Sequence, residues 1–154
     1  MNLSALQSLP LVSFAADHVL IEEGKPLRGI YFLETGEVAV YKNGVLIAET
    51  YQSGAALGEM SWLLGTPPMG TVKTSVPCTL RHVADPDVFL RQNPEIALHL
   101  AVTLARRVDA LASYLAEIKK QFRDRADHLG IIDEVLDSLM HKQPRHIPRR
   151  ATGD

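Results

Sequence analysis

The most informative segment of the sequence is residues 54–72, GAALGEMSWLLGTPPMGTV. The Gly58-Glu59 pair opens a short apolar stretch that predicts a short helix, and Thr71-Val72 predicts the start of a strand. Glycine at residue 58 allows the backbone to approach its neighbours closely. A helix that begins there directs free amide groups and the positive end of its dipole toward an anion.

Short β-rich runs with turn signals between them surround this segment. The expected strands are residues 19–21, 29–33, 38–41, 45–51, 71–74 and 79–83. Lys42-Asn43-Gly44 separates two of these runs, and Asn-Gly is the strongest short-range signal for a β-hairpin. Strands this short and this evenly punctuated predict a barrel or jelly roll rather than a parallel sheet.

The pattern becomes helical after Asp85. Asp85-Pro86 is a good helix start, with Asp as N-cap and Pro in the first turn, and Asn93-Pro94 repeats the signal. The apolar positions that follow are Ala97, Ala101, Leu104, Val108, Leu111, Leu115, Ile118 and Phe122. Their spacing alternates between four and three residues, which is the heptad pattern of a coiled-coil seam.

This seam predicts a homodimer through a helix that covers residues 97–122. Ala97 and Ala101 are expected to pack on the barrel of their own chain. The chain that remains beyond Leu111 is too short to cover the rest, so a second copy is the expected cover. The predicted dimer interface is Leu104, Val108, Leu111, Leu115, Ile118 and Phe122.

A second amphipathic run follows the long helix. Its apolar residues on one face are Leu129, Ile132, Val135, Leu136, Leu139 and Met140. Whether this run folds back on the barrel or joins the dimer is open. The predicted organisation is a domain over residues 1–122, an additional helix over 123–142, and a disordered basic tail over 143–154.

The composition of the chain argues against several classes of function. The formal charge of −2 argues against a general nucleic-acid binder, and no apolar stretch is long enough to cross a bilayer. The first residues lack the pattern of a signal peptide, which predicts a cytoplasmic protein. The single cysteine, Cys78, excludes an internal disulfide and is expected to be a small buried hydrophobe. The six histidines lack the spacing of a metal-binding barrel, and no catalytic motif is present, so neither a metal nor an enzyme is expected.

Residues 54–72 resemble the phosphate-binding cassette of cyclic nucleotide-binding domains. This resemblance implies that the segment wraps a helix N-terminus around an anion-sized hollow. Residues 20–24 and 30–40 are similar to the glycine-punctuated strands of that family, and residues 104–108 to the start of its long C-terminal helix. The resemblance covers about residues 9–120, with several motifs in the right order. It implies a mainly β fold with helices (α+β): a β-roll of the jelly-roll type followed by a long helix.

The resemblance also implies a ligand, cAMP or cGMP, with cAMP favoured. The implied binding residues are Leu57, Gly58, Glu59, Met60, Ser61, Pro68, Met69, Gly70 and Thr71, together with Ser113 on the long helix. The family assigns the ribose hydroxyl to the position of Glu59. We expect Met60 and Trp62 to be core residues, with Trp62 and Leu63 packed beneath the cassette.

One position departs from the family pattern. Pro68 stands where an arginine normally pairs with the phosphate, and shifting the register offers only Met69. Loss of that contact costs about 2–5 kcal/mol of binding. Lys73 is the nearest cation, and its direction on an alternating strand is open. The two adenine-contacting hydroxyl positions of the catabolite activator branch fall on Leu111 and Ala112.

Two interpretations follow. In the first, the chain is a stand-alone sensor that binds a cyclic nucleotide weakly and signals through its dimerising helix. In the second, Gly58-Glu59 serves only the fold, and the chain is a ligand-free dimeric adaptor that docks to an effector protein. The residues after Phe122 are too few for a DNA-binding domain like that of the transcription factors in the family.

Overall fold

The computed structural model describes residues 3–122 and 126–140, apart from the side chains of residues 126–129 and 140. It divides the chain into two compact units, Met1–Leu100 and Ala101–Asp154, which are described one at a time. The predicted tail over residues 143–154 lies outside the described residues. No helix in the described ranges is long and apolar enough to cross a membrane.

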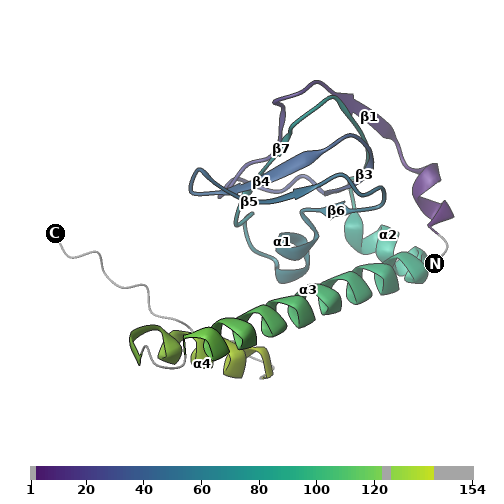
Figure 1. The fold of residues 1–154 in the computed structure, drawn as a ribbon. Coiled ribbons are helices and arrows are strands. Elements are labelled where there is room, and N and C mark those ends of the chain that lie inside the picture. Colours follow the sequence, from purple (N-terminus) through teal and green to yellow (C-terminus); the bar gives the residue numbers. More distant parts are fainter. Residues whose placement is uncertain (1–2, 123–125, 141–154) are drawn as a thin grey trace. The chain divides into compact units, whose positions relative to one another are not determined.

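The first unit is a β-roll with short helices (Figure 1). Its elements are η1 (Ser4–Ser8), β1 (Leu11–Phe14), β2 (Val19–Ile21), β3 (Ile30–Thr35), β4 (Val38–Lys42), β5 (Val45–Thr50), β6 (Ala56–Leu57), α1 (Glu59–Leu64), β7 (Thr71–Thr74), β8 (Cys78–Val83), α2 (Pro86–Gln92) and the start of α3 (Pro94–Gln121). The strands form two four-stranded antiparallel sheets, ordered β1-β8-β3-β6 and β2-β7-β4-β5. This arrangement confirms the predicted fold class.

The hairpin between β4 and β5 forms at the predicted Asn-Gly pair. Lys42 pairs with Val45, which leaves Asn43 and Gly44 as a two-residue loop. Both have positive φ, 51° and 76°, as a hairpin turn of this kind requires. A register shift between Val40 and Tyr41 follows, while β4 itself continues without interruption.

Two apolar clusters hold the roll together, and β3 contributes to both. Ile30 and Phe32, each 1% exposed, belong to the cluster that includes Leu6 and the start of α3. Leu33 faces the other cluster, with Val38 and Leu80. β3 is therefore buried on both faces, as expected of a central strand between two layers.

The helix starts are those that the sequence predicted. The Asp85 side chain accepts a hydrogen bond from the backbone N–H of Val88 at 3.2 Å, and Pro86 is the first residue of α2. Pro94 is the first residue of α3. The prediction that Ala97 and Ala101 pack on the roll was wrong for Ala101, whereas Ala97 is half-buried. Ile96 and Leu100 are buried in the core, whereas Ala101 is exposed.

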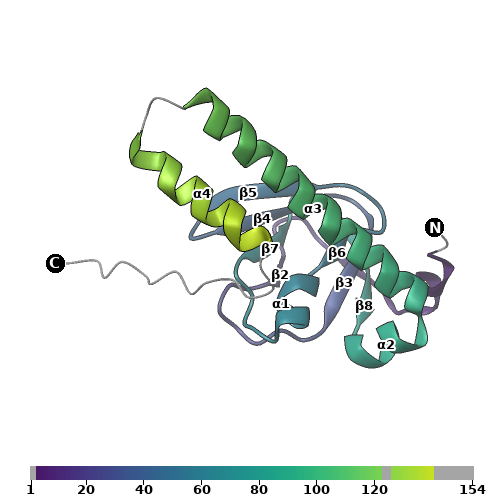
Figure 2. The same ribbon diagram turned by 90° about the horizontal axis from the view of Figure 1, so that it is seen from below.

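The second unit contains the rest of α3 and α4 (Ala126–Met140), which run side by side in opposite directions (Figure 2). The Lys119 ammonium forms an ion pair with the Asp133 carboxylate across the two helices. Part of the predicted seam is open: Val108 is 46% exposed and Leu111 45%. Leu104, Leu115 and Ile118 are half-buried, and Phe122 is 41% exposed.

Candidate functional site

The candidate site begins where β6 meets α1. Tyr31 of β3 pairs with Leu57, and Gly58 follows as the N-cap of α1 with φ of 86°. A Cβ at residue 58 would also lie 2.9 Å from Cδ1 of Ile21. Both the left-handed backbone and this close approach favour glycine here. The sequence therefore places a helix start where the structure shows one.

α1 is a short helix with one buried and one exposed face. Glu59 is 5% exposed and Ser61 is 7% exposed, and Glu59 has an interaction partner within the protein. Met60 is 43% exposed, so its prediction as a core residue was wrong. The helix ends at Gly65, whose backbone N–H donates to the carbonyls of Ser61 and Trp62.

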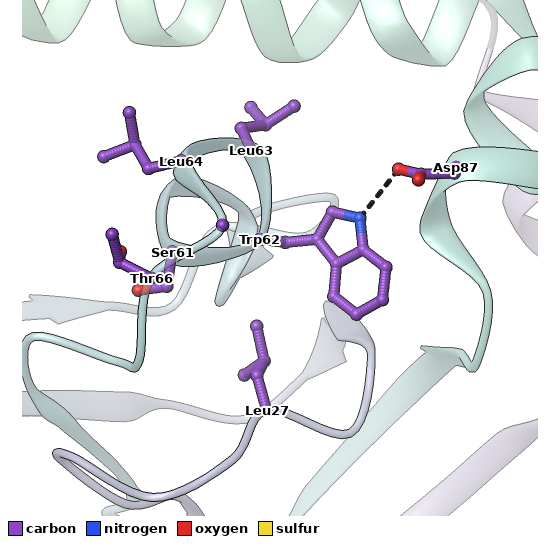
Figure 3. Close-up of a pocket in the computed structure, with 8 residues that line it drawn as sticks. Leu27, Ser61, Trp62, Leu63, Leu64, Thr66 and Asp87 are labelled. Atoms are coloured by element: carbon purple, nitrogen blue, oxygen red, sulfur yellow. Dashed lines mark hydrogen bonds between the residues drawn. The ribbon is translucent and has the colours of Figure 1, made fainter.

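Trp62 connects α1 to α2. Its indole Nε1 donates to Oδ1 of Asp87 at 2.9 Å, and its ring packs partly against the core (Figure 3). A hollow of about 540 Å³ lies here, lined by Leu27, Ser61, Trp62, Leu63, Leu64, Gly65, Thr66 and Asp87. Leu63 is 55% exposed and points away from Leu27, so it does not pack beneath the cassette as predicted. Of the expected ligand residues, only Ser61 lines this hollow.

The second half of the cassette is fixed by three contacts. The carbonyl of Pro68 accepts from the backbone N–H of Gly24 at 2.9 Å. The carbonyl of Met69 accepts from Lys42 Nζ at 3.1 Å, and the hydroxyl of Thr71 accepts from the backbone N–H of Glu23 at 3.1 Å. Pro68 itself is buried.

Both halves of the cassette rest on the connection between β2 and β3. The side chains of Ile21 and Leu27 lie beneath Gly58, and the backbone N–H of Gly24 donates a hydrogen bond to the carbonyl of Pro68. Leu57 at one end and Val72 at the other belong to the same apolar cluster. The structure therefore brings the predicted residues 57–61 and 68–71 onto one part of the roll.

Comparison with known proteins agrees with this geometry. The family model of the cyclic nucleotide-binding domain matches residues 11–90, which is 80 of the 154 residues. The chain belongs to this family. None of the curated proteins matches it.

Several solved structures share the fold. The catabolite activator protein of Thermus thermophilus is 21% identical with a TM-score of 0.64, over 75% of this chain and 57% of that one. The structure described as cAMP-bound PfPKA-R is 24% identical with a TM-score of 0.56, over 71% and 37%. The sensor domain of the transcriptional regulator DNR from Pseudomonas aeruginosa is 23% identical with a TM-score of 0.52, over 80% and 79%. The chain thus spans little more than half of the first of these proteins and about a third of the second.

The cations near the cassette of this cyclic nucleotide-binding domain differ in direction. Lys73 alternates on β7 with the buried Val72 and Thr74, so it points out of the roll, where it lies 3.5 Å from the Asp17 carboxylate. Lys42, which sequence reasoning treated only as a turn residue, contacts the cassette instead. Its position two residues beyond Val40 in β4 is the signal that could have identified it.

Ser113 is an exposed residue of α3 in the second unit, as is Leu111, and Ala112 between them is half-buried. The site in the first unit is therefore described without Ser113. The predicted role of this hydroxyl stays a prediction.

Other polar groups of the roll serve the fold. The Arg81 guanidinium pairs with Glu34 through two nitrogens and donates to the carbonyl of Leu9 at 2.9 Å. Burial raises the pKa of the Tyr31 hydroxyl, and the Arg28 guanidinium partly offsets the rise. Cys78 is 2% exposed, as predicted. Across residues 3–122 and 126–140, no three histidine, cysteine or acidic side chains are placed to hold a metal ion.

Proposed function

We propose that this chain is a regulatory module that binds a cyclic nucleotide weakly, with cAMP preferred, and signals through its long C-terminal helix. The observation that carries the proposal is the cassette: a glycine-capped helix that begins with a buried glutamate and sits on a roll of the cyclic nucleotide-binding family. Glu59 would accept the ribose hydroxyl, and the amides at the start of α1 would face the phosphate.

Such a module is a sensor rather than an enzyme. Signalling requires that the ligand bind one of two conformations better than the other. Within the first unit, the Trp62–Asp87 hydrogen bond joins the cassette to α2, and only Asn93 separates α2 from α3. A shift of α1 on ligand binding would act on the start of α3 through this contact. Because cyclic nucleotides act inside cells, the module would work in the cytoplasm.

The proposed output is a dimer in contact with an effector protein. Val108, Leu111 and Tyr114 leave much of their apolar surface exposed on α3. A second copy of the chain would cover these residues with the same residues of its own α3, as two-fold symmetry requires.

Calorimetry with cAMP and cGMP tests the ligand. We expect a dissociation constant for cAMP between about 10 μM and 1 mM, because the phosphate lacks its usual bidentate partner. Glu59→Gln should weaken binding, whereas Glu49→Gln, an exposed change on β5, should not. Circular dichroism confirms that both variants fold. Absence of heat at millimolar cAMP and cGMP would refute the proposal.

A ligand-free adaptor is the second candidate function. Two observations favour it: Pro68 is buried in the arginine position, and the Thr71 hydroxyl already accepts a backbone hydrogen bond. In this case, the cassette holds the roll together and the dimer presents a fixed surface to its partner. If calorimetry detects no binding of cAMP or cGMP and the chain is still a dimer in solution, the adaptor is favoured.

A further inference from the structure

Lys42 is the third residue on the face of β4 that begins with the buried Val38, and it is itself exposed. Side chains alternate along a strand, so residues 38, 40 and 42 share one face. Val38 is 0% exposed and belongs to the apolar cluster inside the roll, and Val40 packs against the same cluster. Because the irregularity in the hairpin leaves β4 continuous, Lys42 extends this inner face beyond Val40. An ammonium group is therefore placed at the open end of an otherwise apolar face.

The cassette lies directly against this end of β4. A Cβ at Gly70 would come within 2.9 Å of the Tyr41 carbonyl oxygen and 3.4 Å of Cγ1 of Val40. Gly70 thus permits a close approach that a larger residue would block. Lys42 Nζ donates to the carbonyl of Met69, one residue after the arginine position. A cation from β4 consequently reaches the part of the cassette that lacks its own.

The turn that carries Lys42 is itself fixed. The carboxylate of Glu23 accepts from the backbone N–H of Asn43 at 3.1 Å, and the backbone N–H of Glu23 donates to Thr71. The tip of the β4–β5 hairpin is thereby tied to the β2–β3 connection that supports the cassette. The base of the Lys42 side chain has a defined position, although its head is exposed.

The other lysines near the cassette are engaged with carboxylates. Lys25 lies 3.0 Å from Glu22, and Lys73 lies 3.5 Å from Asp17. Within the described residues, Lys42 has only the neutral Met69 carbonyl as a partner at its head. An ammonium has three donors, so two remain for an anion while that contact persists.

We infer that Lys42 supplies the positive charge for the phosphate of the bound nucleotide, in place of the arginine that Pro68 replaces. This role rests on the proposed function. A lysine offers a point charge rather than the planar fork of a guanidinium, so it binds phosphate with less directionality and, at an exposed position, with less energy. The substitution explains why a site without arginine would still bind, and bind weakly.

The test compares cAMP with adenosine, which lacks the phosphate. Lys42→Gln keeps a donor for the Met69 carbonyl and removes the charge. We expect it to weaken cAMP binding about 5- to 50-fold and to leave adenosine binding unchanged. Lys42→Arg should bind cAMP at least as well as the wild type. Lys73→Gln, the same change on the outer face of the same sheet, should have no effect.

Salt provides a second readout. Raising sodium chloride should weaken cAMP binding to the wild type and have much less effect on Lys42→Gln, because the screened charge is gone. Equal cAMP affinity in Lys42→Gln and wild type would overturn the role of Lys42 while the proposed function stands. Equal losses for cAMP and adenosine would also overturn it, because they would show a structural role. No cAMP binding by the wild type would instead refute the proposed function and this role together.

Discussion

Replacing Pro68 with arginine tests whether the cassette still encloses a space for a phosphate. The proline contributes its carbonyl to the hydrogen bond from Gly24, and an arginine keeps that carbonyl. The backbone of the loop should therefore hold its position on β2–β3. Loss of the proline ring should lower the free energy of unfolding by about 0.4–1 kcal/mol, because the unfolded chain gains freedom, and any burial of the guanidinium without a phosphate partner lowers it further.

The expected gain in affinity follows from opposing contributions. A bidentate guanidinium–phosphate contact stabilises the complex by about 2–5 kcal/mol. Ordering the arginine side chain costs about 1.5–2 kcal/mol. The net gain lies between about 0 and about 3.5 kcal/mol, and its midpoint of about 1.8 kcal/mol corresponds to about 20-fold in the dissociation constant for cAMP. Because the guanidinium would take over from Lys42, adding Lys42→Gln to Pro68→Arg should cost less than Lys42→Gln alone.

Calorimetry with cAMP measures the change, and the neighbouring proline supplies the control. Pro67 is exposed, so Pro67→Arg adds the same charge outside the buried position. A thermal melt shows whether each variant folds. An equal gain in cAMP affinity in both variants would show that the added positive charge attracts the anion from any nearby position. A folded Pro68→Arg with no gain would show that the space beneath the cassette is closed, which favours the adaptor.

Two further predictions concern the helix and the roll. The exposed surface of Leu111 amounts to about 80 Å², and covering it would stabilise the proposed dimer by about 2 kcal/mol per copy. The double variant Leu111→Glu, Leu115→Glu should therefore be a monomer in light scattering. An unchanged mass would place the interface elsewhere. The raised pKa of Tyr31 means that the folded state holds the hydroxyl proton more tightly than the unfolded chain does. The protonated hydroxyl therefore contributes fully to the free energy of unfolding below about pH 10, and this contribution is lost as the pH rises through the folded-state pKa. Tyr31→Phe should therefore lose less stability than the wild type as the pH rises above about 10 in urea titrations.

Local signals in the sequence predicted the parts of the fold that depend on neighbouring residues. The Asn43-Gly44 turn requires positive φ at two successive positions, and few other pairs satisfy that requirement. The Asp85 cap acts on an amide three residues away. Such features are determined within one turn of the chain, so they can be read from the sequence directly.

Packing between distant segments could not be read in the same way. The heptad pattern identified the long helix but not the face that packs on the roll, because Ile96 and Leu100 also repeat at helical spacing. The exposure of Met60 and Leu63 depends on which neighbours surround α1. Trp62 reaches Asp87 across 25 residues, and only the folded chain shows that pair.

The placement of the cassette on the roll could be predicted from the sequence, whereas the contact from Lys42 could not. Which of these residues bind a ligand stays a prediction. Residues 57–61 and 68–71 were identified by similarity to a known cassette, and the structure brings them together. The cassette gave no indication of Lys42, because its contact with Met69 spans 27 residues. The alternation of side chains along β4 places Lys42 on the same face as Val38 and Val40. Which face of β4 this is becomes clear only from the register with β7, which pairs Val40 with the buried Val72.

The contacts that hold the cassette in place are of two kinds, and they bear differently on function. Gly58, Gly70 and the Pro68 carbonyl act through the backbone, so the fold needs them whether or not a ligand binds. Their presence alone therefore does not distinguish a sensor from an adaptor. Lys42 is different, because its ammonium has no carboxylate partner among the described residues, and the role proposed above depends on that charge. A charge without a carboxylate partner, on the same face of β4 as Val38 and Val40, is the feature that favours a sensor over an adaptor.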